Sequence, residues 1–589
     1  MPANSLKFWP AFTSRTDLQS YGSSALLLFA LQMKFNIEDI ATVASTSLTE
    51  GGGDKKADLI YIDSESGNAV IAQSYFTQKT LDKNGKPIKE APANKASDLN
   101  TAVSWLLCAP IEDLPSELRA HAAELRQAIN EKTIERLHIW YVHNLPESKN
   151  VDKEISVVGV TAKSIIEAIF EDTDIDILPL EVGINVLEGW YQFGLTPILV
   201  SDEFKIETIG GFPISGPDWT AYVTSIPAKW LYEQFKLYKT DLFSADIREY
   251  LGSRKSDRNI NFAIQTTAQK DPGHFWVYNN GITALVHEFQ PIKIDDKPGI
   301  QIKGFSIVNG AQTTGVIGAL SAPPADKAYV QVRFIKCTNV NRVHDIVLFN
   351  NSQNRVSGPD FRSNDPIQRR LLTEFEIIPN IDYVPRRGGF EDVIKRRPDS
   401  LPSITAGQAL AAFHDDPDVA YHQKTKLWDD DKLYSKYFHE HTTAKHILFS
   451  YSLLKAVENK KIDLINKSKN GTLIELEQNE LNFFRKRGSI FLMVAAIAKC
   501  MEVILGKPIP TPFNLTFKSN LPPDEAASKW TKIIETTAPF VNQLEDGVSD
   551  GFRNRPMVDI SIRKFQSMVA SSKAANSEPY DRFAVDISF

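Results

Sequence analysis

The chain has 589 residues, of which 42% are hydrophobic and 24% charged, with a formal net charge of −7 and three cysteines. These values exclude disorder of the whole chain, and the acidic balance argues against broad wrapping of a nucleic-acid duplex, because neutralising phosphates requires a basic surface. Widely spaced cysteines and the lack of any apolar run of membrane length predict a reduced, cytoplasmic protein without a signal peptide or membrane segment.

Hydropathy patterns divide the chain into four stretches. The length predicts about three to five domains, at roughly 100–200 residues per domain. Helices and strands alternate in the first stretch, β-type runs mix with Pro and Gly in the second, the third changes character again, and helical spacing dominates the fourth. We therefore expect a mixed α/β, or α+β, multidomain protein divided at residues 1–150, 151–235 (a strand-rich connecting region), 236–400 and 401–589.

The first stretch is predicted to contain a β-hairpin flanked by helices. Alternating hydrophobic residues at 57–63 and 68–76 predict two strands, and the SESG sequence between them predicts a turn. Further predicted elements are helices at residues 18–35 and 97–108 and a buried strand at residues 138–143.

Two oxygen-bearing side chains lie at the same end of this hairpin. Asp58 is at the start of the first strand, shortly after a glycine run, and Gln73 is near the end of the second. The layout resembles the core of PD-(D/E)xK nucleases, a restriction-endonuclease-like α/β fold in which Asp and Glu or Gln on neighbouring strands hold a divalent metal. The resemblance implies Mg²⁺ at Asp58 and Gln73 if the site is active, to activate water and stabilise phosphate charge. A capping or turn carboxylate is the alternative for Asp58.

Tyr75 occupies the position where PD-(D/E)xK nucleases normally carry a lysine, two residues after the Glu or Gln. A phenol has a pKa near 10 and is neutral at pH 7, so Tyr75 cannot supply that positive charge. Either the site no longer cuts and the domain only binds, or a lysine has moved in from Lys79, Lys95, Lys55 or Lys56. Lys79 is taken as the catalytic candidate beside Asp58 and Gln73.

Four later segments carry a second resemblance. They are YKTDLFSADIREYLGSRKSDRNINFAI (238–264), HFWVYNNGITAL (274–285), FSIVNGAQTTG (305–315) and VLFNNSQNRVSGPDFRSND (347–365). In order and spacing they resemble the core of the abortive-infection phage-resistance (AIPR) family, over about residues 236–440. In that family a nuclease-like front end is a usual companion.

The AIPR resemblance implies a bacterial phage-defence protein that engages DNA or RNA. A non-catalytic sensor or binding module and a nucleotide-binding core are the alternatives. A phage or defence-system protein is a further expected class of partner, self-association through the helical tail stays open, and no membrane partner is expected.

Polar residues in the AIPR-like segments are typical of a binding site. The aromatic run HFWVY is expected to be a strand, and Asn279 and Asn280 follow it in an Asn-Asn-Gly turn. This turn is either a plain hairpin turn or part of a pocket. Asn309, Gln312 and Thr313 follow an apolar strand and begin a helix, where outward-pointing N–H groups suit an anion.

Amides and arginines further along extend this set. The amide cluster that contains Asn351 and Gln353 suits base recognition or an internal hydrogen-bond network. Arg386 and Arg387 lie beside a Gly-Gly turn, and arginine forks bind phosphate well. Other basic groups are Lys395 to Arg397, Arg254 with Lys255 and Arg258, and Arg369 with Arg370. These groups form either a local nucleic-acid track or solvated surface charge.

Two smaller groups complete the predictions. Glu38 and Asp39 are either an extra acidic metal ligand or solvated charges at a helix end. His439, His441 and His446 are closely spaced, but we expect a helix terminus there without a metal.

Overall fold

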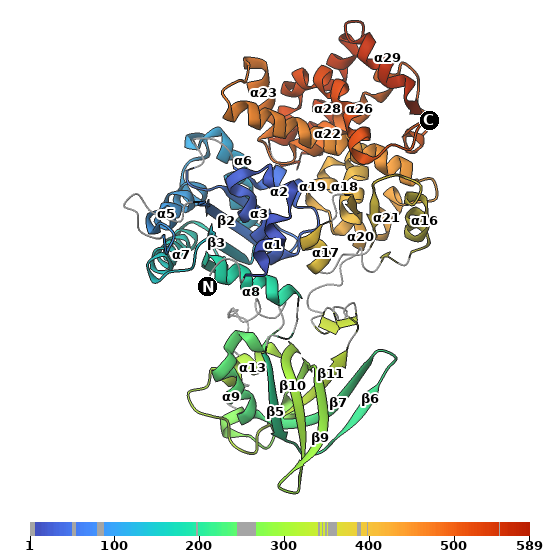
Figure 1. Ribbon diagram of the computed structural model, residues 1–589. Coiled ribbons are helices and arrows are strands. Elements are labelled where there is room, and N and C mark those ends of the chain that lie inside the picture. Colours follow the sequence, from blue (N-terminus) through green and yellow to red (C-terminus); the bar gives the residue numbers. More distant parts are fainter. Residues whose placement is uncertain are drawn as a thin grey trace. The chain divides into compact units, whose positions relative to one another are not determined.

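The computed structural model describes residues 6–49, 55–78, 88–195, 198, 200–243, 267–337, 339, 342–343, 346–347, 350, 362–363, 365–385, 390–396, 399–549, 551–552 and 554–589. It has the expected mixed α/β architecture with a helical C-terminal region (Figure 1). Contacts group the chain into two compact units. The larger unit comprises residues 11–185, 357–388 and 392–589, and the smaller unit comprises residues 1–10, 186–356 and 389–391.

A four-stranded sheet forms the N-terminal part of the larger unit. Its strands are, in spatial order, β1 (Leu59–Asp63), β2 (Asn68–Tyr75), β3 (Arg136–His143) and β4 (Asp176–Val182). The β1–β2 pair is antiparallel and turns at Gly67, whose φ of +72° favours glycine. The other two pairs are parallel because helices cross between their strands. The predicted strands and turn are confirmed.

Helices cover both faces of this sheet. On one face Phe35 stacks on Trp140 with ring centroids 5.7 Å apart. On the other face the buried side chains of the sheet and three helices share one core, which includes Ile71, Leu106 and Val158. Helix α3 (Ala25–Phe35) packs on the first face, and α4 (Ile40–Ser47) contacts β1. The second face is covered by α5 (Ala93–Cys108), α6 (Ser116–Asn130) and α7 (Lys149–Ile169).

The C-terminal part of the larger unit is helical, as predicted. A continuous apolar core runs through it, around residues such as Phe449, Met493 and Trp530. Its main helices are α16 (Pro366–Phe375), α17 (Phe390–Lys395), α18 (Ser403–Phe413), α19 (Pro417–His422), α21 (Asp431–Tyr437), α22 (Ala444–Lys469), α23 (Glu475–Phe484), α24 (Ser489–Lys499), α25 (Met501–Leu505), α26 (Pro523–Thr537), α28 (Arg555–Ser571) and α29 (Ser577–Val585). None of the helices in the described ranges combines the length and apolar character of a membrane span.

Polar contacts connect the N-terminal sheet with these C-terminal helices inside the larger unit. Arg487, just before α24, forms an ion pair with Glu124 of α6 at 2.5 Å and donates to the Ile60 carbonyl oxygen at 3.2 Å. Lys424 forms an ion pair with Asp63 at 3.3 Å. The stretches predicted as separate ends of the chain therefore pack as one compact body.

The smaller unit is built on a seven-stranded mixed sheet in its described residues. The order is β5 (Val200–Glu207), β10 (Lys297–Asn309), β8 (Ile282–Leu285), β11 (Tyr329–Cys337), β7 (Trp219–Pro227) and β6 (Gly211–Ser215), with β9 (Glu288–Ile294) paired to β10. Helices α9 (Ala228–Tyr238) and α13 (Ala311–Gly318) share an apolar core with one face of the sheet.

Two local expectations are corrected. The aromatic run HFWVY was expected to be a strand before the Asn-Asn-Gly turn, but it contains the short helix α12 (Phe275–Tyr278). The stretch expected to be strand-rich also contains α7 and α8 (Ile184–Leu195). In α7 buried residues recur at helical spacing, for example Ile155, Val158 and Ala162, and this period outweighs the β-branched composition.

Candidate functional sites

Asp58 lies just before β1 and is held against β2. Its backbone N–H donates to the Ala72 carbonyl oxygen at 2.8 Å. Its carboxylate Oδ2 accepts from the Ser74 N–H at 2.6 Å and the Ser74 hydroxyl at 3.0 Å. The carboxylate is thereby fixed beside the strand that carries Gln73.

Gln73 is buried, with 5% of its surface exposed, and its Oε1 has no hydrogen-bond partner in the described chain. Side chains alternate along a strand, so Gln73 and Ser74 point to opposite faces of β2. Asp58 is bonded to Ser74, and Gln73 is the residue next to it. If a Mg²⁺ ion binds at this end of the hairpin, Asp58 and Gln73 are the residues that would hold it through their oxygen atoms.

Tyr75 has a lysine beside it. The Lys95 ammonium nitrogen, from the first turn of α5, lies 5.2 Å from the centre of the Tyr75 ring. Lys79 lies outside the described residues. The other two candidates also face α5: the Lys56 ammonium is 3.9 Å from Asp98, and the Lys55 ammonium is 4.2 Å from the centre of the Trp105 ring. Among the candidate lysines that the structure describes, Lys95 is thus the one that contacts Tyr75.

The same end of the sheet carries three polar residues that sequence reasoning missed. Tyr141 pairs in register with Gln73, is fully buried, and its hydroxyl lacks a hydrogen-bond partner within the described ranges. Burial raises the pKa of Tyr141, and nearby Tyr75, Glu181 and Asp98 add to the effect. His143 Nε2 lies 3.0 Å from Glu181 Oε1, and both residues are buried. The sequence signal that could have identified His143 and Glu181 was the presence of a His and a Glu within otherwise apolar strands.

Glu181 also has a structural role. Its two carboxylate oxygens accept from the Ser148 N–H at 3.1 and 3.0 Å, immediately before α7 begins. The Leu145 N–H donates to His143 Nδ1 at 3.3 Å, so His143 Nε2 carries the proton that faces Glu181. This end of the sheet therefore combines a fixed His–carboxylate pair with two unpartnered buried groups, the Gln73 amide oxygen and the Tyr141 hydroxyl.

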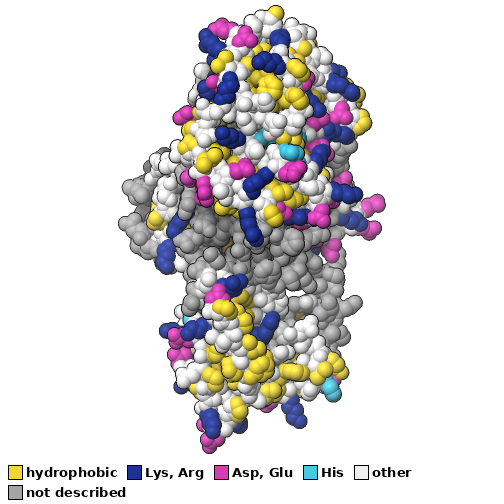
Figure 2. Space-filling model, turned by 90° about the vertical axis from the view of Figure 1, so that its right-hand side faces the viewer, with side chains coloured by type: hydrophobic (Ala, Val, Ile, Leu, Met, Phe, Trp, Pro, Cys, Tyr) yellow, Lys and Arg dark blue, Asp and Glu magenta, His cyan; other side chains and the backbone are white. Residues whose placement is uncertain are grey.

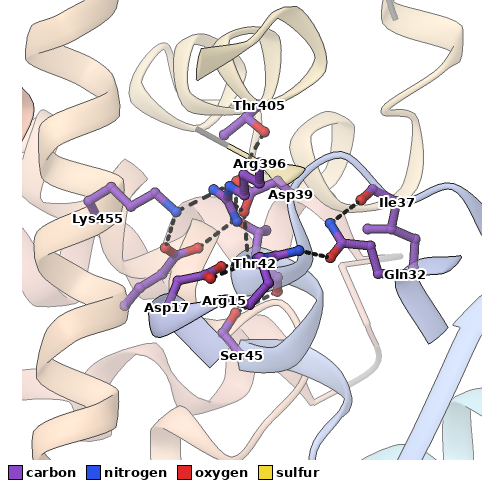
Figure 3. Close-up of polar contacts among 11 residues, drawn as sticks. Arg15, Asp17, Gln32, Ile37, Asp39, Thr42, Ser45, Arg396, Thr405 and Lys455 are labelled. Carbon is purple, nitrogen blue, oxygen red and sulfur yellow. Dashed lines mark hydrogen bonds and ion pairs between the residues drawn. The ribbon is translucent and has the colours of Figure 1, made fainter. Parts of the chain in front are cut away.

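Asp39 is a buried carboxylate with several positively charged and hydroxyl partners (Figure 3). It lies 3.3 Å from Arg396 and 3.5 Å from Lys455, and accepts from the Thr42 and Thr405 hydroxyls. Burial opposes its charge, but Lys455, Arg396 and Thr42 outweigh that cost and lower the pKa of Asp39. Asp39 is thus a buried structural charge, which corrects both the metal-ligand and the solvated alternatives.

The predicted basic residues differ in burial and in their contacts. Arg396 is buried in the Asp39 cluster, so it is neither a nucleic-acid contact nor a solvated charge. Arg370 donates to the carbonyl oxygens of His439 and Thr442 at 3.1 and 2.6 Å, while Arg369 is exposed. Lys395, the last residue of α17, is exposed. The other predicted basic residues lie outside the described ranges: Arg386, Arg387, Arg397, Arg254, Lys255 and Arg258.

The histidine-rich segment forms an internal contact. His446, in the first turn of α22, places Nδ1 2.8 Å from the Leu515 carbonyl oxygen and Nε2 2.9 Å from His414 Nε2. Burial, opposed by the Leu515 contact and aided by His439, lowers the pKa of His446 to about 4. Across the described ranges, no cluster of three or more His, Cys, Asp or Glu side chains could hold a metal ion.

In the smaller unit, the Asn-Asn-Gly turn is internally bonded. The Asn279 side chain donates to the Thr313 hydroxyl at 3.0 Å and accepts from the Gly281 N–H at 2.8 Å. At φ +77°, Gly281 has no room for a Cβ, which would lie 2.5 Å from the Gln331 carbonyl oxygen. The structure brings Asn279 and Thr313 together, and Asn280 is exposed next to them.

Asn309 belongs to a neighbouring polar group. Its amide donates to the Asn350 carbonyl oxygen, and it pairs across the sheet with Thr283. Arg333, which sequence reasoning missed, donates to the Thr283 hydroxyl at 2.7 and 3.1 Å and to Asn350 Oδ1 at 3.0 Å. Gln312 is half-buried in the first turn of α13, whereas Asn351 and Gln353 lie outside the described residues. Arg333 was missed because a single arginine within a strand belongs to no recognisable sequence motif.

Together these units define a mixed α/β multidomain protein with a helical C-terminal region. Residues 243–537, about half of the chain, match the model of the AIPR protein family, and the chain belongs to this family. Family membership supports a general role in phage defence by abortive infection. No curated protein and no solved structure matches the chain. The predicted family is confirmed, whereas the PD-(D/E)xK assignment of the N-terminal sheet stays a prediction.

Proposed function

We propose that this AIPR protein engages nucleic acid during phage defence and that its N-terminal sheet is a metal-dependent, nuclease-like site. The observation that carries the proposal is the arrangement at one end of the β1–β2 hairpin. There Ser74 fixes the Asp58 carboxylate beside β2, and the adjacent residue, Gln73, has an amide oxygen without a hydrogen-bond partner among the described residues. The Lys95 ammonium lies beside Tyr75. These are the ligand types and the positive charge that the PD-(D/E)xK resemblance calls for.

Asp58 and Gln73 are the residues that would hold Mg²⁺, and the ion would activate a water molecule and stabilise charge on the phosphate. Gln73 Oε1 suits that role because it is an oxygen ligand without a protein partner among the described residues. Ser74 orients Asp58 through two hydrogen bonds. Lys95 would supply the charge that Tyr75 lacks, and we propose it in place of Lys79.

The direct test is cleavage of DNA and RNA, single- and double-stranded, in the presence of Mg²⁺ or Mn²⁺. We expect metal-dependent products with the wild-type chain and their loss in Asp58→Ala. Asp113→Asn, at an exposed carboxylate outside the hairpin, is the matched control and should cut like the wild type. Cleavage that survives Asp58→Ala unchanged contradicts the proposal.

The lysine assignment has its own pair of variants. If Lys95 supplies the cation, Lys95→Gln should lower the cleavage rate by about a hundredfold, the scale of removing one charge-stabilising donor. Tyr75→Lys in the Lys95→Gln background should restore part of that rate. Lys132→Gln, in an exposed turn after α6, controls for the loss of a positive charge. An unchanged rate in Lys95→Gln removes Lys95 from the site.

A second candidate function is non-catalytic binding by the same domain. It is favoured by Tyr75 at the lysine position and by Ser74, whose N–H and hydroxyl already occupy one Asp58 oxygen. This alternative predicts nucleic-acid binding in EDTA without turnover, and no gain of cleavage in Tyr75→Lys. Retention of a labelled oligonucleotide with no product under any metal condition would support it over the nuclease.

A third candidate is nucleotide binding by the smaller unit. It is favoured by the Asn309, Asn350 and Arg333 group at the end of β10, where α13 begins. Calorimetry with ATP, CTP and GTP tests it. If none of the three nucleotides gives heat of binding at about millimolar concentration, this candidate is dismissed. A Kd of about 1 mM corresponds to a binding free energy of roughly −4 kcal/mol.

A further inference from the structure

Arg333 forms no ion pair with any residue that the structure describes. Its guanidinium is exposed, yet it is held in place by the Thr283 hydroxyl and the Asn350 amide oxygen. Among all its contacts in the described chain there is no carboxylate. A guanidinium fixed by neutral oxygens keeps its full charge and its remaining N–H groups for an anionic ligand, and phosphate fits its fork geometry.

Strand register places further ligand-type side chains in line with Arg333. Five residues pair in succession across β6, β7, β11, β8 and β10, so their side chains share one face: Phe212, Val223, Arg333, Thr283 and Asn309. The other face is the one that packs on α9 and α13, through residues such as Val330 and Val332. We call the face with the five paired residues the Arg333 face.

Aromatic rings are exposed on and beside the Arg333 face. Phe212 is 56% exposed, and Trp276 and Tyr278 of α12 are 44% and 67% exposed. Trp276 Nε1 donates to the Ser225 hydroxyl at 2.8 Å, and Ser225 pairs with Gln331, two residues from Arg333 on the same face. Figure 2, which views the side of the smaller unit where β6 and β7 lie, shows hydrophobic side chains gathered there.

We propose that the Arg333 face binds a single strand of nucleic acid. Arg333 takes a phosphate, Trp276 and Phe212 stack on bases, and the Asn309 amide contacts a base edge. Stacking on protein rings requires unpaired bases, which favours a single strand over a duplex. A broad duplex contact would also need a basic surface, which a chain of net charge −7 does not offer overall. An apolar protein partner would leave the fixed charge of Arg333 buried without compensation.

This inference shares its ligand class with the proposed function but uses a different surface and no metal. Its readout is therefore binding in EDTA, whereas the nuclease is scored by metal-dependent products, so either can fail without the other. The probes are fluorescent oligothymidylate and oligouridylate of about 12 nucleotides, within the usual range of such sites. The full-length protein is titrated at several salt concentrations, with duplex DNA and thymidine monophosphate as competitors.

Two variants test the two kinds of contact. Trp276→Leu should weaken oligonucleotide binding by about tenfold or more, the usual scale of one lost base stack, and Trp276→Phe should lose less. Arg333→Gln should weaken binding and reduce the slope of log K against log salt by about 0.7, the value for one phosphate contact on a single strand. Lys229→Gln, on α9 at the other face, is the matched charge control and should bind like the wild type.

The outcomes separate clearly. Binding that depends on Trp276 and Arg333, and that single strands compete for better than duplex, supports the Arg333 face. Equal affinity for duplex, binding of thymidine monophosphate alone, or wild-type affinity in both variants overturns it. Circular dichroism of each variant shows whether it is folded, and because Trp276→Phe and Arg333→Gln are mild, at least one variant of each contact type stays informative.

Discussion

The Asp39 cluster in the larger unit and the Arg333 face in the smaller unit use charge in opposite ways. Asp39 is buried and has two cations and two hydroxyls around its carboxylate. Arg333 is exposed, and its partners among the described residues are neutral oxygens. A charge whose partners are all in the fold stabilises the fold, whereas a charge that is oriented but not neutralised is available to a ligand. Gln73 and Tyr141 differ from both, because each is a buried, uncharged group whose polar atom has no hydrogen-bond partner among the described residues.

The largest expected effect is on stability, at Asp39. Asp39→Ala removes the ion-pair partner of the largely buried Arg396 and one of the two carboxylates beside Lys455, which keeps Glu458 at 2.8 Å. The free energy of unfolding of the larger unit should therefore fall by about 3–5 kcal/mol. Urea unfolding followed by circular dichroism measures it. Glu578→Gln, which breaks only an exposed pair with Arg582, should leave the unfolding midpoint nearly unchanged. A small loss in Asp39→Ala would mean that the cluster is not a structural charge.

The next effect depends on pH and involves His446. Burial keeps this imidazole neutral in the fold, with a pKa of about 4, while an unfolded histidine takes up a proton near pH 6.5. Between these values the unfolded chain binds more protons, so the free energy of unfolding falls as the pH drops from 6.5 to 4, by about 3 kcal/mol in total. Urea unfolding at several pH values should show this slope reduced in His446→Gln. An equal slope in both proteins would contradict the prediction.

A smaller effect of opposite sign is expected at Gln73. Its buried amide oxygen lacks a partner in the described chain, and such a group costs roughly 1–3 kcal/mol. Gln73→Met should therefore raise the free energy of unfolding by about 1 kcal/mol while removing any metal-dependent activity. Thermal unfolding with and without Mg²⁺ checks both parts. Gln127→Met, on the surface of α6, controls for the substitution itself.

The smallest stability effect belongs to Arg333. Because its side chain is exposed, Arg333→Gln should change the free energy of unfolding by no more than about 0.5 kcal/mol. The same variant is expected to weaken oligonucleotide binding, so stability and binding should separate at this position. A loss of several kcal/mol in urea unfolding would place Arg333 with Asp39 as a structural charge and end the contrast between the two regions.

Local patterns predicted the secondary structure of the N-terminal sheet well. Alternation at residues 57–63 and 68–76 identified β1 and β2, and the turn at Gly67 followed from its sequence. The prediction failed where composition and period disagreed, as in α7, whose β-branched residues suggested strands. The aromatic run before Asn279 failed similarly, because a four-residue helix has too few positions to show a period.

Predictions of the sites depended on distance along the chain. Asp58 and Gln73 were predicted to lie on one hairpin, and they do, because they are close in sequence. The prediction did not consider that side chains alternate along β2, so that Ser74, and not Gln73, bonds to Asp58. Lys95 beside Tyr75 and Glu181 beside His143 come from different elements and have no fixed spacing. Asp39 and Arg396 are 357 positions apart, so their ion pair had no sequence signal.

The sequence by itself determined the family, the mixed α/β architecture and the hairpin that carries Asp58, because motifs and strand alternation are local properties of the chain. Only the tertiary structure decided which charges are compensated and which are not. That distinction depends on burial and on partners brought together from distant segments. Asp39 contacts its cations across the larger unit, whereas the described partners of Arg333 are neutral oxygens.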